Sequence, residues 1–384
     1  MEEHLTSFDS MKQKNSLSII KVIKNEPGIC RSEIAKKTRL ASQTITNLVK
    51  EMEKNRLIIE RNLPNNTKGR NPIGLFLNYG NFYVISVEMK LDVVNLWLSS
   101  IDNKIFKEDS FTPSKNLISD LKEKIEIFLN ISLQIRRRIM GIVISVDGIV
   151  DDKSGPILDF QTFNIDSFEL KKELTLLKIP FYIRNDVNLF AYCANLAKKS
   201  SGNSIVIKLD SEISSSLIIE NQVFPSSTYL GEIGYMKVHN PKETRTSKTH
   251  GSNCVVFYLG KEALIKDYGK DYDSLVQDVK EMKVDAVKVI EDSLAGFAPI
   301  LANICIFLRL EEVFLYGKIA NDFRSIVFRY LYSKLVDNMS YRTPFKTLKI
   351  LEKRPVYMLG TNFFLNYVID NFDEYLLQRN QEDK

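Results

Sequence analysis

The sequence has few of the residues that build disulfide frameworks or metal centres. Its 384 residues include only four cysteines and three histidines. The cysteines lie far apart and form no CxxC pair, a pattern typical of reduced thiols in a cytoplasmic protein. A His/Cys metal cluster is hard to assemble from so few ligands. We therefore expect a cytoplasmic protein without a bound metal.

Long apolar runs are also missing. The N-terminus is polar and mixed in charge, so no signal peptide is expected. The one stretch similar to a membrane span, Leu294 to Leu308, is interrupted by Pro299 and Asn303. It is also shorter than the roughly 20 residues that a span needs, so we expect a buried core helix there. The composition is ordinary for a globular protein, and the length allows two or three domains.

What the chain does have is a helix-turn-helix pattern at residues 31–57. The second helix carries one apolar stripe, made by Ile45, Leu48, Val49 and Met52. Its opposite face carries short or amide-bearing side chains, which suit contacts with base edges in a major groove. The residues expected to contact DNA from the two helices are Arg31, Ser42, Gln43, Thr44, Thr46, Asn47 and Lys50. From these helices alone, an ordinary helical hairpin with a solvated face is an equally good interpretation.

The flanking segments favour the DNA-reading interpretation. An amphipathic helix at 17–23 stops at a Pro-Gly break, which completes a three-helix core. Short apolar strands are expected at 57–59 and 73–77, on either side of a basic turn that contains Lys68 and Arg70. Helix, helix-turn-helix and hairpin together predict a winged helix, with Lys68 and Arg70 positioning its wing on DNA. A flexible linker is the alternative interpretation of the basic turn.

Positive charge is concentrated in this predicted winged helix, which we place at residues 1–78. Residues 1–75 hold 14 Lys/Arg against 8 Asp/Glu, whereas the whole chain has a formal net charge of +5. A cation-rich surface neutralises phosphates and supplies the salt-dependent part of DNA affinity. A solvated basic face is the alternative explanation. Its coincidence with a recognition-helix pattern favours DNA binding.

Beyond residue 78, strands alternate with helices. Strands are expected at 82–88, 93–98, 181–183, 204–208, 216–220 and 312–316, with a further strand that ends at Asp147-Gly148. Helices are expected at 117–135 and 167–177, from Asp186 onward, and through most of 261–308. This alternation predicts an α/β protein whose sheets are covered on both faces. We expect two lobes, 79–200 and 201–361, with a C-terminal helix at 362–384 returning to the first lobe.

Four segments carry a resemblance to a known family. They are Lys68-Gly69-Arg70-Asn71-Pro72, Asn185-Asp186-Val187-Asn188, Gly231-Glu232-Ile233-Gly234-Tyr235-Met236 and Leu310 to Gly317. In order, spacing and letters, the chain resembles the ROK group of repressors, open reading frames and kinases, in particular its sugar-responsive repressors. The resemblance covers almost the whole chain. It implies a two-lobed α/β body of the actin-like, RNase H-like sugar-kinase type, preceded by an N-terminal winged helix-turn-helix.

The resemblance also implies a ligand site. Asn185 and Asp186 stand where a strand ends and a helix begins, the edge at which open α/β folds bind ligands. In active kinases of the family the matching aspartate is the general base and the asparagine binds the sugar. The residues implied for an effector site are Asn185, Asp186, Glu232 and Asn164. Asp186 would also be the N-cap of its helix, and a cap by itself would explain the Asn-Asp pair.

Several positions depart from the family's pattern. Tyr235 stands where the family has a zinc-binding histidine, and only Cys254 remains of the cysteine-rich loop, so no metal is expected. Cys30 stands where a serine N-cap is usual in the helix before the DNA-binding turn. Because cysteine is a poor cap, that helix is expected either to fray or to rely on Glu33 in its first turn.

The turns that should hold a nucleotide have lost their glycines. Backbone amides approach a phosphate most easily where no Cβ is in the way. The three turns in question read Glu88 to Asp92, Leu209 to Ile213, and Tyr316-Gly317-Lys318. These losses argue against ATP binding, so Asp186 is interpreted as a vestigial catalytic base. We therefore expect a protein without enzymatic activity and without a cofactor.

The sequence therefore predicts a transcriptional regulator, a repressor of carbohydrate-related genes. It would bind a two-fold-symmetric DNA operator as a homodimer or homotetramer and respond to a sugar or sugar phosphate. Two alternatives stay open. One is a sugar kinase that carries a winged helix, and the other is a ligand-independent regulator whose body serves only for dimerisation.

Overall fold

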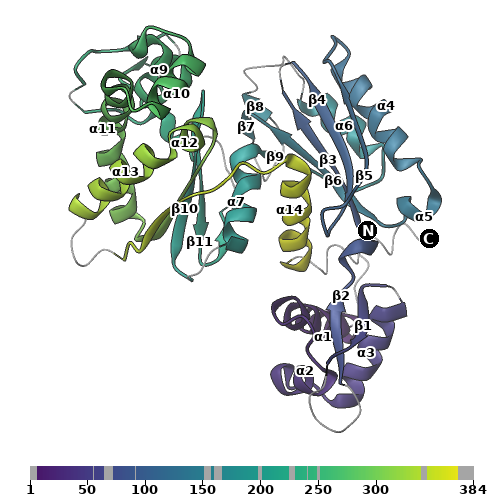
Figure 1. Ribbon diagram of the computed structural model, residues 1–384. Helices are drawn as coiled ribbons and strands as arrows, with labels where there is room; N and C mark the ends of the chain where they lie inside the picture. Colours follow the sequence, from purple (N-terminus) through teal and green to yellow (C-terminus); the bar gives the residue numbers. More distant parts are fainter. Residues whose placement is uncertain are drawn as a thin grey trace. The chain divides into compact units, whose positions relative to one another are not determined.

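The structure is a computed structural model that describes most of the chain (Figure 1). The described residues are 7–54, 56–64, 72–90, 92–150, 157–159, 167–197, 201–224, 230–239, 241–248, 251–338 and 344–370. The chain divides into two compact units. The first comprises residues 1–144, 169–182 and 356–384, and the second comprises 145–168 and 183–355.

The N-terminal part of the first unit is a three-helix core with a two-stranded hairpin. Its elements are α1 (Ser7–Asn25), α2 (Arg31–Thr38), α3 (Ser42–Lys54), β1 (Ile58–Asn62) and β2 (Ile73–Leu77). Ile19, Ile34, Ile45 and Leu75 are fully buried at its centre. The predicted winged helix therefore forms, although α1 begins well before its apolar stripe.

A close backbone approach joins the loop after α1 to the wing. The amide of Gly28 donates to the Leu75 carbonyl at 2.8 Å, and the Leu75 amide donates to the Ile29 carbonyl at 3.0 Å. Gly28 has a φ of 92°, and a Cβ on Gly74 would lie 2.6 Å from the Gly28 carbonyl oxygen. Both positions therefore require glycine.

The first unit also contains a five-stranded sheet in the order β5-β4-β3-β6-β9. Its strands are β3 (Tyr83–Met89), β4 (Val94–Ser100), β5 (Ile105–Phe111), β6 (Ile139–Val146) and β9 (Phe181–Asn185), preceded by the 3-10 helix η1 (Tyr79–Asn81). β3, β4 and β5 are antiparallel neighbours, with Tyr83 opposite Ser100. Strands β7 (Ile149–Val150) and β8 (Ile157–Asp159) form a separate hairpin after β6.

The helices of this unit are α4 (Leu117–Leu129), α5 (Leu133–Arg136), α6 (Ser167–Thr175) and α14 (Val356–Asp370). The single helix predicted at 117–135 is broken, because the Ser132 hydroxyl accepts the Ile135 amide at 3.1 Å and starts a new helix. The C-terminal helix begins at Val356, earlier than expected, and packs against β3 and β4. There Gly360 lies against Ser86.

The second unit is built on a sheet in the order β12-β11-β10-β15-β16. Its strands are β10 (Asn203–Leu209), β11 (Ile213–Ile219), β12 (Gln222–Val223), β15 (Leu310–Tyr316) and β16 (Thr347–Ile350). β10, β15 and β16 are parallel, whereas β11 and β12 are antiparallel to their neighbours. The parallel strands bring the ends of β10 and β15 to one edge of the sheet.

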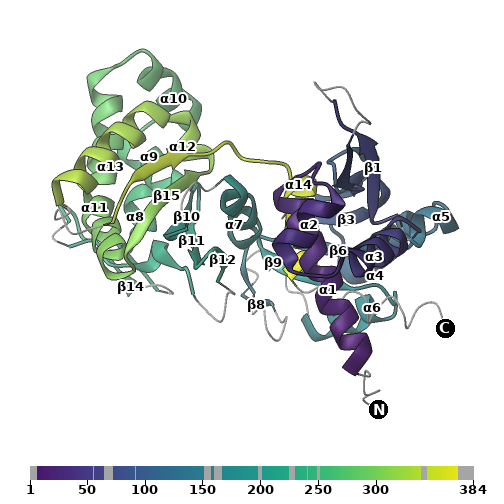
Figure 2. The ribbon, with the colours of Figure 1, turned by 90° about the horizontal axis from the view of Figure 1, so that it is seen from below.

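Helices lie on both sides of this sheet (Figures 1 and 2). α7 (Asp186–Ala197) packs on β10, β11 and β12, so it groups with the second unit, whereas the expected first lobe ran to residue 200. The other helices are α8 (Val256–Leu259), α9 (Lys261–Tyr268), α10 (Tyr272–Lys280), α11 (Val284–Phe307), α12 (Lys318–Asp322) and α13 (Arg324–Asn338). The short elements η2 (Ile233–Tyr235), β13 (Thr246–Ser247) and β14 (Gly251–Ser252) precede α8.

Helix α11 is long and apolar. Among the described residues it is the one helix that could cross a membrane by length and composition, and half of its most apolar stretch is buried inside the protein. Leu294, Leu301 and Cys305 are fully buried in the core of the second unit. The predicted core helix at 294–308 is therefore confirmed, although Phe307 at its end is 85% exposed.

Candidate functional site

The polar face of α3 is exposed because the helix is anchored by its other face. Its predicted apolar stripe is buried throughout, and Ser42, Gln43, Asn47 and Lys50 are exposed opposite it. The Gln43 side-chain amide donates to the Asn47 Oδ1 at 3.2 Å. This bond uses half of each amide and leaves the Gln43 oxygen and the Asn47 nitrogen for another partner. A bidentate amide contact of this kind is what reads adenine in a major groove.

The threonines of α3 are less available than predicted. Thr44 and Thr46 are both half-buried. The Thr46 hydroxyl donates to the Ser42 carbonyl of its own helix at 2.9 Å. Its proton is therefore engaged, and it can only accept from a base or a phosphate.

Arg31 is held by two carboxylates. Its guanidinium pairs with the Glu60 carboxylate of β1 and lies 3.6 Å from the Glu53 carboxylate of α3. Desolvation, together with the Glu60 charge, raises the pKa of Glu53, against the opposing effect of Arg31. Arg31 thus joins α2 to α3 and the wing, and its expected contact with DNA stays a prediction.

The start of α2 settles the question raised by Cys30. The Cys30 amide donates to the Glu33 Oε2 at 3.0 Å, so Glu33 caps the helix from inside its first turn. Burial, and then the Glu33 charge, raise the pKa of the Cys30 thiol. Arg39, in the turn before α3, is exposed with a φ of 59°, and the sequence pattern did not single it out. The predicted wing contacts Lys68 and Arg70 lie outside the described residues.

In the second unit, Asn185 is the helix cap that was predicted for Asp186. The Asn185 Oδ1 accepts the Val187 amide at 2.9 Å, and its Nδ2 donates to the Gly148 carbonyl at 2.6 Å. Asn185 is 8% exposed, and both ends of its side-chain amide are bonded to the backbone. Asp186 is the first residue of α7, and its carboxylate is left to face the end of β10.

That carboxylate meets a buried lysine. The Lys208 ammonium lies 2.8 Å from Asp186 Oδ2 and 2.9 Å from Asp147 Oδ1. The Lys208 side chain is 6% exposed. Burial lowers the pKa of Lys208, but the two facing carboxylates outweigh it and raise the pKa above its ordinary value. The sequence analysis missed this residue, although a lone lysine inside an otherwise apolar strand was the signal for it.

Two polar atoms beside this ion pair have no partner among the described residues. One is Asp186 Oδ1, and the other is the hydroxyl of Tyr316. The Tyr316 ring stacks on Phe190 at 3.8 Å between ring centres. Burial, and then the Asp186 and Asp147 charges, raise the pKa of Tyr316, so its hydroxyl stays protonated. An acceptor and a donor are therefore buried beside the ion pair without a partner among the described residues.

The predicted phosphate turns are filled by the chain's own acids. The Asp210 carboxylate accepts the Ser211 amide at 3.0 Å and the Lys318 amide at 3.3 Å. The turn after β15 keeps Gly317, with a φ of 104°, because a Cβ there would lie 2.4 Å from the Leu209 carbonyl oxygen. In the first turn, Glu88 accepts from Asn95 and pairs with Lys90 at 3.0 Å. In these turns, carboxylates of the chain accept from the backbone N–H groups and pair with the cation that could otherwise bind a phosphate.

The remaining expected ligand residues are only partly placed. Glu232 starts η2, directly after Gly231, whose carbonyl accepts the Ser215 amide at 2.7 Å on β11. Asn164 lies outside the described residues. Within the described part of the chain, no group of three His, Cys, Asp or Glu residues is arranged to hold a metal ion. Cys254 instead accepts from the Lys237 ammonium at 3.0 Å.

Comparison with known proteins identifies the two parts of the chain. Residues 84–354 match the ROK family, and residues 12–59 match a family described as winged helix-turn-helix DNA-binding. The chain is 31% identical over 231 residues to the xylose repressor of Staphylococcus xylosus, which covers 58% of this chain and 60% of that protein. It is 22% identical over 245 residues to the DNA-binding transcriptional dual regulator NagC of Escherichia coli K12, covering 62% and 60%. The chain thus matches about 60% of the length of these relatives.

Solved structures show the same fold. A ROK family transcriptional regulator, a homolog of the E. coli MLC protein, superposes with a TM-score of 0.80 at 17% identity, over 97% of this chain and 99% of that one. The ROK hexokinase from Thermus thermophilus superposes with a TM-score of 0.62 at 14% identity, over 76% and 100%. The predicted fold class is confirmed. With the family match extending over residues 84–354 behind a winged helix, the chain belongs to the ROK family.

Proposed function

We propose that the protein is a sequence-specific DNA-binding transcriptional regulator that represses carbohydrate-related genes. The observation that carries the proposal is the exposed amide face of α3, held by a fully packed winged helix. The repressor names of the relatives support it. The test is selection of binding sites from random duplex DNA by the purified full chain. Enrichment of a two-fold-symmetric site is expected, and a pool without sequence enrichment would contradict the proposal.

A two-fold operator requires two winged helices, so the regulator acts as a homodimer or a higher symmetric assembly. One helix offers an apolar face for such contact. Phe328, Tyr332 and Val336 of α13 follow at intervals of four residues and are 42%, 37% and 51% exposed. Phe328 and Tyr332 stack on each other at 5.4 Å. A second copy of the chain is the proposed occupant of this face, since like faces pack across a two-fold axis.

Sedimentation measurements test this face. Tyr332→Lys places a charge in the proposed contact and weakens the dimer, so this variant should already dissociate at protein concentrations at which the unchanged protein is still dimeric. Lys334→Glu, on the same helix but off the stripe, is the matched control. If Tyr332→Lys leaves the dimer dissociation constant unchanged, the dimer contact lies on another surface.

The ROK body binds an effector in this proposal and does not phosphorylate it. Asp186, at the position of the general base in active kinases of the family, has its Oδ2 engaged with the Lys208 ammonium. Asp210 already takes the Lys318 amide at the start of α12. An ATP-turnover assay with a sugar panel should give no activity above background. Robust turnover would restore the kinase alternative.

The effector is a sugar or sugar phosphate that binds at the Asp186 site. The two atoms there without a partner among the described residues, Asp186 Oδ1 and the Tyr316 hydroxyl, are its proposed contacts. Its binding changes the relative orientation of two winged helices, and a fixed half-site spacing tolerates little such change. One observation favours a second candidate, a ligand-independent regulator, because Lys208 already neutralises part of the site. Thermal melting with xylose, N-acetylglucosamine and their phosphates separates the two, since a ligand of the folded state raises the melting temperature.

A further inference from the structure

The second unit contains a cavity of about 450 Å³ that shares no residue with the Lys208 cluster. It lies between residues 238–239 and 241–245 on one hand and helix α11 on the other, with Tyr258 and Asp267 also in its wall. Its volume is within the range of small-molecule sites. Helix α11 lines the cavity with Val289, Asp292, Ser293, Ala295 and Gly296.

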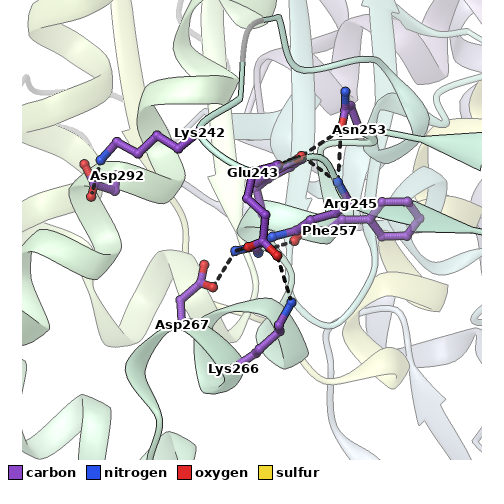
Figure 3. A network of polar contacts seen from close by, with 9 residues as sticks. Lys242, Glu243, Arg245, Asn253, Phe257, Lys266, Asp267 and Asp292 are labelled. Carbon is purple, nitrogen blue, oxygen red and sulfur yellow. Dashed lines mark hydrogen bonds and ion pairs between the residues drawn. The ribbon is translucent and has the colours of Figure 1, made fainter.

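Ordered polar groups surround the cavity (Figure 3). The Arg245 guanidinium donates to the Phe257 carbonyl at 2.6 Å and to the Asp267 carboxylate at 2.5 Å. It lies over the ring of Tyr258 at 4.8 Å, and its side chain is only 14% exposed. Its Nε is buried without a hydrogen-bond partner among the described residues. Arg245 is therefore a fixed cation in the cavity wall, held by a carbonyl, a carboxylate and an aromatic ring.

The charged groups around the cavity are paired. Lys242 pairs with Asp292 at 2.8 Å, and Arg245 pairs with Asp267. Glu243 lies 3.6 Å from Arg245 and 3.9 Å from Lys266, which is outside the cavity lining. The lining itself carries two cations and three carboxylates, and a charged ligand would compete with these pairs. A neutral ligand with hydroxyl groups would use the remaining lone pairs and N–H groups without disturbing them.

The rest of the wall is apolar. Val238 is 7% exposed, and Pro241, Val289 and Ala295 also line the cavity. A wall with charged, paired groups on one side and aliphatic groups on the other fits a molecule with hydroxyl groups on its edge and C–H groups on its faces. We propose that the cavity is a binding site for a neutral polyhydroxylated molecule of monosaccharide to disaccharide size, separate from the Asp186 site.

The test measures binding by calorimetry with xylose, sorbitol and sucrose as neutral probes and gluconate and glucosamine as charged ones. The full chain carries Asp186→Asn in every titration, so that the result does not depend on the effector site of the proposed function. Ala295→Leu fills the cavity from an exposed position of α11. Asn303→Leu, exposed on the same helix away from the cavity, is the matched control.

At least one neutral probe should bind, with affinity reduced tenfold or more by Ala295→Leu and unchanged by Asn303→Leu. Glu243→Gln, at a 63% exposed position, removes one of the three carboxylates that line the cavity and should shift preference toward gluconate. The proposal is overturned if no neutral probe binds the Asp186→Asn chain, or if Ala295→Leu leaves its binding unchanged. Tighter binding of either charged probe before Glu243 is replaced would overturn the assigned ligand class.

Discussion

The reading face of α3 and the cluster around Lys208 use similar polar side chains in opposite ways. On α3, Gln43 and Asn47 are exposed and engage each other through only half of their amides. In the body, Lys208 is buried and both of its carboxylate partners come from the same chain. The first arrangement is prepared for an external partner. In the second, the charged groups are paired within the same chain.

The largest effect should come from Lys208→Met. Removing the ammonium leaves Asp186 buried beside Asp147 without a cation, which costs about 3 kcal/mol of unfolding free energy. Urea unfolding measures it. Lys242→Met removes an ion pair whose lysine is 81% exposed, so a change within about 1 kcal/mol is expected from this control. Equal losses of unfolding free energy in the two variants would show that the buried Lys208 pair contributes no more to stability than the exposed Lys242 pair.

The next largest effect concerns base recognition. Gln43→Ala or Asn47→Ala should relax base preference at one operator position by about 1–3 kcal/mol, because one amide contact is lost. Binding to a set of single-base operator variants measures this. A uniform loss of affinity across all variants would mean that these amides position the protein and do not specify sequence.

A smaller effect separates the two roles considered for Arg31. Because its guanidinium pairs with Glu60 and Glu53, Arg31→Ala should lower the stability of the winged helix by about 1 kcal/mol. The dependence of DNA affinity on salt should stay unchanged. A salt slope reduced by about one would instead reveal a phosphate contact.

The smallest effect is a difference in alkaline stability. The pKa of Lys208 is raised in the folded protein, because two carboxylates outweigh its burial. Its contribution to stability is therefore complete below the unfolded lysine pKa of about 10.4 and is lost as pH rises through the higher folded value. The unchanged protein should lose stability above about pH 10.4 more steeply than Lys208→Met. Parallel curves would show that the ion pair does not titrate in this window.

Sequence reasoning succeeded where the signal was local. The apolar stripe of α3 and the alternation of strands and helices depend on residues close together in the chain, and both were predicted. It failed where the partner was distant. Nothing near Lys208 indicates that Asp147, 61 residues away, faces it, and Arg31 meets Glu60 only because the wing folds back. The cap at Asn185 was misplaced by one residue, since both Asn and Asp are good caps.

The bond between Gln43 and Asn47 has a consequence for how such a regulator acquires a new operator. Each amide fixes the orientation of the other, so exchanging one residue also reorients its neighbour. Under the proposed base contacts, the positions contacted by Gln43 and Asn47 are therefore inherited together. A shift to a different target sequence is expected to require substitutions at both positions, and single changes should produce proteins that read neither operator well.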